Sequence, residues 1–173
     1  MLSSLLGIPE DFNIVFTSSA TEIWERIIQN QVVHHSLHFT NGAFSEKFAD
    51  ISEDLNRKVT RFAGPEKGGF ELNNLSLPDD TELISITQNE TSLGSQFPLE
   101  DIAVIRQKFP EKIIAVDAVS SIPYPEFNYN HFDHLYFSVQ KCFGLPSGLG
   151  VWIVNNKSVE RALELRSNGH SIG

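Results

Sequence analysis

Cysteine, clustered positive charge and long apolar runs are scarce in this sequence of 173 residues. Its single cysteine, Cys142, can form neither an internal disulfide nor a multi-thiolate metal site, and we expect it to be a small buried apolar side chain. The 13 Lys and Arg are outnumbered by 22 Asp and Glu, which gives a net charge of −9 without a basic block. The field that attracts proteins to phosphate backbones is therefore absent, and we expect no nucleic-acid partner.

Targeting and membrane-spanning patterns are also missing. The first residues, MLSSLLGIPEDF, lack the basic region of a secretory signal, and no apolar run approaches the length that crosses a bilayer. A lone cysteine fits a reducing compartment. We therefore expect a cytoplasmic protein with no membrane partner.

The apolar content is sufficient for one packed core. Hydrophobic residues make up 40% of the chain, 13 of them Phe, which excludes disordered and fibrous architectures. The length suits one domain of ordinary size or part of a larger enzyme, so we treat residues 1–173 as one domain.

Apolar segments with strand character alternate with segments of helical periodicity. Strands are predicted over residues 12–17, 36–40, 58–62, 82–88, 112–117, 134–139 and 151–154. Helices are predicted after Ser19, over 44–55, from Pro98 to Phe109 and around 159–166. This alternation favours an α/β fold with a mostly parallel sheet. The glycines and prolines of residues 144–150 force a reversal, so the strand at 151–154 is expected to run antiparallel.

Polar groups follow the predicted strands at their carboxyl ends, where open α/β sheets bind ligands. They are residues 18–21, residues 88–91, Asp117 and the pair Gln140-Lys141. The first group has capping-box spacing, with Ser19 at the N-cap and Glu22 three residues on, so it places a helix N-terminus at this edge. A phosphate site, a carboxylate and an amine together suit an anionic aromatic cofactor that condenses with lysine.

The sequence resembles the class V family of pyridoxal-phosphate aminotransferases, of the aspartate-aminotransferase fold type, and its motif style is closest to phosphoserine and alanine–glyoxylate aminotransferases. The motifs that carry the resemblance are FTSSATE (16–22), NGAFSEKFADI (41–51), NETSLG (89–94), AVDAVSS (115–121) and SVQKCFGLPSGLGVWIV (138–154). It implies a mostly parallel mixed sheet with helices on both faces. Residues 1–173 then correspond to a partial cofactor-binding large domain, without the N-terminal segment and the C-terminal small domain of the relatives.

The same resemblance implies catalytic roles for two residues. Lys141 forms the internal Schiff base with pyridoxal 5′-phosphate, and its freed amine then moves a proton between substrate and cofactor. Asp117 keeps the pyridine nitrogen protonated, so that the ring acts as an electron sink. Gln140 reaches the cofactor beside the lysine. The competing interpretations are a solvated loop lysine and a strand-end carboxylate that caps the next turn.

Further residues are implied to bind the cofactor. Ser19, Ala20 and Thr21 bind its phosphate at the helix N-terminus. Phe44 stacks on the pyridine ring where relatives often carry Trp, although a core Phe is the alternative. Thr91 matches the family threonine near the phenolic oxygen.

The expected function is transfer of an amino group between a small amino acid and a 2-oxo acid, in a homodimer that shares its cofactor sites. The alternatives are a pyridoxal-phosphate lyase or cysteine desulfurase, which generally shows His where this chain has Gln140, and a non-catalytic α/β fragment that keeps only the fold. The arginine that binds the substrate carboxylate in relatives lies outside this sequence, so the substrate cannot be identified from the sequence.

Two groups of histidines raise the question of a metal site. One contains His34, His35 and His38, and the other contains His131 and His134. Neither repeats a closed-site spacing with a third ligand of matching type, so we expect no metal.

Overall fold

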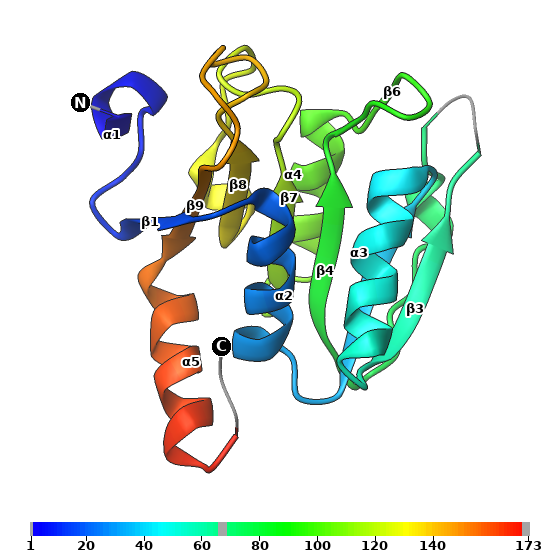
Figure 1. Cartoon of the computed structure of the whole chain (residues 1–173). Helices are drawn as coiled ribbons and strands as arrows, with labels where there is room; N and C mark the ends of the chain where they lie inside the picture. The colour runs from blue at the N-terminus through cyan, green and yellow to red at the C-terminus, as the bar shows by residue number, and fades with distance from the viewer. Residues whose placement is uncertain (1, 66–68, 171–173) are drawn as a thin grey trace.

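The computed structural model describes residues 2–65 and 69–170, and its centre is a seven-stranded sheet of order β1-β9-β8-β7-β4-β2-β3 (Figure 1). Its strands are β1 (Phe12–Thr17), β2 (His35–Thr40), β3 (Lys58–Ala63), β4 (Thr81–Thr87), β7 (Ile113–Asp117), β8 (His134–Ser138) and β9 (Gly150–Asn155). The helices are α1 (Leu2–Leu6), α2 (Ala20–Gln31), α3 (Ala43–Asp54), α4 (Leu99–Lys108) and α5 (Asn156–Ser167). Short 3-10 turns, η1 (Leu72–Asn74) and η2 (Tyr129–His131), and a hairpin of β5 (Asn89–Glu90) and β6 (Ser95–Gln96) complete the described elements.

The direction of the strands confirms the α/β prediction. Strands β3, β2, β4, β7 and β8 run parallel, and β9 pairs antiparallel with both β8 and β1. The loop of glycines and prolines before Gly150 therefore reverses the chain as predicted. Because β1 runs antiparallel to β9, it points in the same direction as β8. The carboxyl ends of β1, β4, β7 and β8 consequently meet at one edge of the sheet.

Hydrophobic residues fill both faces of the sheet, as expected for strands covered by helices on each side. Along β7, Ile113 and Ala115 pack in a cluster with α2 and α3, whereas Ile114 and Val116 pack in a second cluster with α4. Figure 1 shows α2 and α3 in front of the sheet and α4 behind it. Helix α5 packs against α2 and β9.

The start of α2 differs in one detail from the capping box predicted by the sequence. Ser19 is the N-cap, and its hydroxyl accepts a hydrogen bond from the Glu22 amide at 3.1 Å. The Glu22 carboxylate, however, accepts from the amide and hydroxyl of Ser18 at 2.8 and 2.7 Å, and from Arg26, rather than from the Ser19 amide. The capping-box pattern considers only residues 19 and 22, and so overlooks the donors that Ser18 offers to Glu22. The hydrogen bonds from Ser18 and from Arg26 lower the pKa of the Glu22 carboxyl to about 2.

Other expectations need correction. Cys142 is exposed, not buried, because it lies on the loop between β8 and β9, where no element covers it. The short helix α1 and the β5–β6 hairpin were not predicted from the sequence, since neither contains enough residues to show a periodicity. No described helix combines the length and the apolar character that a bilayer crossing requires.

Candidate active site

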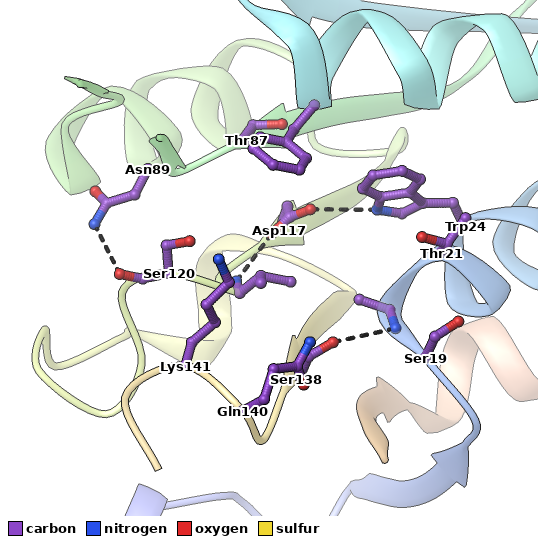
Figure 2. A pocket seen from close by; sticks show the side chains of 13 residues that line it. Ser19, Thr21, Trp24, Thr87, Asn89, Asp117, Ser120, Ser138, Gln140 and Lys141 are labelled. Atoms are coloured by element: carbon purple, nitrogen blue, oxygen red, sulfur yellow. Dashed lines mark hydrogen bonds between the residues drawn. The ribbon is translucent and has the colours of Figure 1, made fainter. Parts of the chain in front are cut away.

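A cavity of about 280 Å³ lies at the carboxyl edge of the sheet (Figure 2). Its walls come from the N-terminal turns of α2 and α3, the ends of β4, β7 and β8, and the loops that follow them. The lining residues are Ser19, Ala20, Thr21, Trp24, Phe44, Thr87, Asn89, Asp117, Val119, Ser120, Ser138, Gln140 and Lys141. The fold thus brings segments more than a hundred residues apart in the chain, such as Ser19 and Lys141, to one cavity.

The N-terminus of α2 forms one end of the cavity. The amides of a first helical turn have no intrahelical acceptor, and the helix dipole makes this end attractive to anions. Here the Ala20 amide donates to the Ser138 hydroxyl of β8 at 3.3 Å, which fixes the turn against the sheet. The turn also passes directly over Gly150, where an added Cβ would lie 2.5 Å from the Thr17 hydroxyl and 2.7 Å from the Ser19 backbone. Only glycine at this position of β9 leaves room for the turn that leads into α2.

Asp117 lies at the end of β7 and is only 4% exposed. Its Oδ1 accepts a hydrogen bond from the Val119 amide at 2.9 Å, and its Oδ2 accepts one from the Trp24 indole at 3.3 Å. Burial raises the pKa of Asp117 to about 7, although the two hydrogen bonds counteract the shift. The negative charge of Glu90 adds to the increase. A positively charged group in the cavity would find here a carboxyl with few competing partners.

Lys141 lies on the opposite wall, on the loop after β8. A turn closed by the hydrogen bond from the Gly144 amide to the Lys141 carbonyl, at 3.0 Å, holds it there. Figure 2 shows its side chain pointing from this loop toward Asp117. The sequence-based expectation that the amine and the carboxyl lie in one cleft is therefore met by the geometry.

The N-terminus of α3 brings Phe44 to the cavity, where its ring is 42% exposed. The buried carboxylate of Glu90 holds this turn by accepting from the amides of Phe44 and Ser45 at 3.4 and 2.9 Å. The Ser92 hydroxyl donates to the same carboxylate at 2.6 Å. Although burial acts to raise the pKa of Glu90, these hydrogen bonds outweigh it and lower the pKa. An internal anion thus occupies this helix N-terminus.

The predicted site residues are all in the cavity lining except Thr91. Thr91 is exposed in the turn after β5. Its neighbour Asn89 lines the cavity instead, with its amide nitrogen donating to the Ser120 carbonyl at 3.2 Å. The role of Thr91 at the cofactor remains a prediction that this geometry does not support.

Asn89 belongs to the strand-end group 88–91, but sequence reasoning missed other lining residues, namely Trp24, Thr87, Val119, Ser120 and Ser138. Three of them, Val119, Ser120 and Ser138, were within motifs that the sequence analysis quoted, so the strand-end rule could have found them. Trp24 carried no such signal, because it lies in the middle of an amphipathic helix. Among the residues the structure describes, no group of three or more His, Cys, Asp or Glu is placed to hold a metal ion.

The profile of the family described as aminotransferase class-V matches residues 2–172. The chain belongs to this family. It is 29% identical to the phosphoserine aminotransferase of Rhodococcus opacus over 172 residues, which are 97% of this chain and 44% of that protein. The crystal structure of a phosphoserine aminotransferase from Cytophaga hutchinsonii is 46% identical, with a TM-score of 0.96, and the match covers 99% of this chain and 48% of that one. A pyridoxal-phosphate-bound phosphoserine aminotransferase from Trichomonas vaginalis is 25% identical, with a TM-score of 0.76, over 92% of this chain and 45% of that one.

The chain therefore spans slightly less than half the length of these relatives. The family match also confirms the predicted resemblance and the fold it implied, a mostly parallel mixed sheet. The cofactor of this family is pyridoxal phosphate, and the cavity fits it in charge and in polarity. The α2 N-terminus suits a phosphate, buried Asp117 suits a cationic ring nitrogen, and the buried Oδ1 of Asn89 has no hydrogen-bond partner among the described residues.

Proposed function

We propose that this chain forms the cofactor site of a pyridoxal-phosphate-dependent aminotransferase that transfers an amino group between a small amino acid and a 2-oxo acid. The observation that carries the proposal is the convergence of Lys141 and Asp117, from the ends of two neighbouring strands, on the cavity that the α2 N-terminus closes. An amine, an acid and an anion site in one cavity are what this cofactor requires.

Pyridoxal phosphate, when bound, supplies an electron sink that acidifies the Cα–H of an amino acid. The chain's own residues bind it and move protons. The turn at Ser19, Ala20 and Thr21 would hold the phosphate through amides and hydroxyls, and the Phe44 ring would lie against the pyridine. Lys141 would be the residue that bonds to the aldehyde carbon, and its free amine would serve as the base for the Cα proton of the substrate.

Asp117 acts by charge. A cationic ring nitrogen at its carboxylate favours the ionised form, so cofactor binding is expected to lower the pKa of Asp117 from about 7. The ionised carboxylate in turn keeps the nitrogen protonated. The low polarity of the β7 end strengthens this pair relative to the same charges in water.

We further infer that two copies of the chain assemble as a cytoplasmic homodimer. Loops after β7 and β8 carry large apolar side chains that the fold leaves uncovered, with Tyr124 exposed by 93% and Leu145 by 53%. These loops rise together above the carboxyl edge of the sheet in Figure 1. Exposed apolar groups next to a ligand cavity are typical of a face that another chain covers. Sedimentation equilibrium tests this: the unmodified chain should be a dimer, and the variant with both Tyr124→Ser and Leu145→Ser should be a monomer. A monomer in the unmodified chain would refute the inference.

The function is tested by covalent labelling. The chain is incubated with pyridoxal phosphate, reduced with borohydride and digested, and the modified peptide is identified by mass spectrometry. We expect the label on Lys141, and its loss in Lys141→Ala but not in Lys157→Ala, which removes an exposed lysine of α5. A label distributed over surface lysines would leave a non-catalytic α/β fragment as the better description. A single turnover with an amino acid then separates transamination from lyase chemistry, because transamination leaves the amino group on the cofactor as pyridoxamine phosphate and releases the 2-oxo acid, whereas a lyase leaves the cofactor as pyridoxal phosphate.

A further inference from the structure

Each of the two tryptophans of the chain donates its indole N–H to a buried acceptor. Trp152 donates to Nδ1 of His134 at 3.0 Å, away from the cavity. Trp24 donates to Oδ2 of Asp117 at 3.3 Å, inside the cavity wall. The two residues share their chemistry and their burial and differ in what they bind.

The Trp24 ring is held firmly by two helices. It is 3% exposed and stacks on Phe48 of α3, with centroids 5.5 Å apart and planes inclined by 13°. The edge of Phe48 in turn contacts Tyr136 and His38 of the sheet. An indole that is buried and stacked on an anchored ring in this way keeps its N–H aimed in one direction.

Trp24 is the one side chain among the described residues with a hydrogen bond to Asp117. The other donor is the Val119 amide, which binds the other carboxylate oxygen. The charged or titratable groups that face Asp117 are Glu90, whose charge raises its pKa, Tyr136 beside it on β8, and Lys141 across the cavity. None of these is shown to donate a hydrogen bond to the carboxylate.

We propose that Trp24 is a positioning residue of the cofactor site, whose indole N–H orients the Asp117 carboxylate and favours its charged form. Helix α2 then serves both ends of the cofactor, because its first turn binds the phosphate and the next turn places Trp24 against the acid that meets the ring nitrogen. The effect of Trp24 on cofactor binding rests on the proposed function. The hydrogen bond from its indole to the buried Asp117 carboxylate is present in the chain without any cofactor.

The test compares Trp24→Phe with Trp152→Phe. Phenylalanine keeps a ring that can stack on Phe48 and removes the N–H together with part of the indole volume, and Trp152→Phe makes the same change at the other buried tryptophan. In the cofactor-free chain, carboxyl NMR of Asp117 should show titration at higher pH in Trp24→Phe and no change in Trp152→Phe. Affinity for pyridoxal phosphate at neutral pH should fall about tenfold in Trp24→Phe alone, the effect of one hydrogen bond to a charged group.

A double substitution separates positioning from general packing. In an Asp117→Asn background, Trp24→Phe should no longer change the pH dependence of cofactor binding, because the group it acts on is gone. If Trp24→Phe does not fold, which its unfolding curve would show as a loss of cooperativity, a tryptophan analogue takes its place. Benzothienylalanine, incorporated at position 24 of the Trp152→Phe variant, keeps the indole shape without the N–H. Unchanged titration of Asp117 in these variants would overturn the proposal even if Lys141 is labelled. Failure of labelling in the unmodified chain would instead refute the proposed function and leave the titration result standing.

Discussion

Replacing Asp117 by Asn should stabilise the cofactor-free chain at neutral pH, although it removes a group that we place at the cofactor. Asn has the shape and the neutral charge of protonated Asp117, so the substitution mimics the charge state that burial favours. Its amide nitrogen cannot accept, however, so one of the two hydrogen bonds from Val119 and Trp24 is lost, at a cost of about 1–3 kcal/mol that does not depend on pH. The carboxyl has an ordinary pKa of 3.8 and a pKa of about 7 in the fold. Between these values the folded chain keeps a proton that the unfolded chain has released, so raising the pH favours unfolding.

The magnitude follows from the difference between the two pKa values. Ionised Asp117 lowers the free energy of unfolding by about 4 kcal/mol once the pH exceeds the folded-state value. For a chain of this size that amounts to a change of about 10 °C, between pH 4 and pH 8, in the difference in melting temperature between Asp117→Asn and the unmodified chain. Near pH 4 both folded proteins carry a neutral group at position 117, so Asp117→Asn should lose its advantage there and show only the cost of the lost hydrogen bond.

Thermal unfolding followed by circular dichroism from pH 4 to pH 8 measures this difference. Titration of other groups affects both proteins equally, so only the gap between the two curves matters. Asp79→Asn, which neutralises an exposed carboxylate, is the control and should show no such gap. Parallel curves for Asp117→Asn and the unmodified chain across this range would show that the carboxyl is not desolvated, and the argument for its role at the ring nitrogen would lose its physical basis.

Two further substitutions test how the cavity is built. Glu90→Gln should cost about 1–3 kcal/mol of stability above pH 4.5, because it removes a charged acceptor from the first turn of α3. Since the pKa of Glu90 is lowered in the fold, this cost should disappear as the pH falls below 4.5 in thermal melts, and a cost independent of pH would contradict it. Gly150→Ala should push the turn at Thr17 and Ser19 out of place, and weaken binding of pyridoxal phosphate about tenfold or more while binding of pyridoxal, without phosphate, changes little. Equal losses for both ligands, measured by absorbance titration, would show that the turn does not bind the phosphate.

The sheet was predictable because its signals are local. The apolar run Ile113–Asp117 with a charge at its end predicts a buried strand that delivers a carboxylate to the sheet edge. The glycines before β9 require a reversal whatever the rest of the chain does. In the same way the hydroxyl of Ser19 determines where α2 begins. Each of these features depends on a few neighbouring residues.

The site was predictable only in part. The strand-end rule found Asp117, Gln140 and Lys141 because it needs the direction of the strands and nothing more. It missed the partner of Asp117, since a helical periodicity marks Trp24 as a core residue and cannot show which way its N–H points. The rule selected the whole group 88–91 and the family resemblance then chose Thr91 from it, whereas in the fold Asn89 lines the cavity, because the β5–β6 turn decides which side chain faces inward.

The amino-acid sequence by itself determined the order and type of the main helices and strands, the antiparallel direction of β9 and the amine and acid at the strand ends, because periodicity, capping and glycine placement act over a few residues. Tertiary structure alone decided that the indole of Trp24 reaches a carboxylate 93 residues away, that Glu90 occupies the N-terminus of α3 and that Cys142 faces solvent. Such contacts depend on how helices pack on the sheet, and packing is set by the whole chain at once.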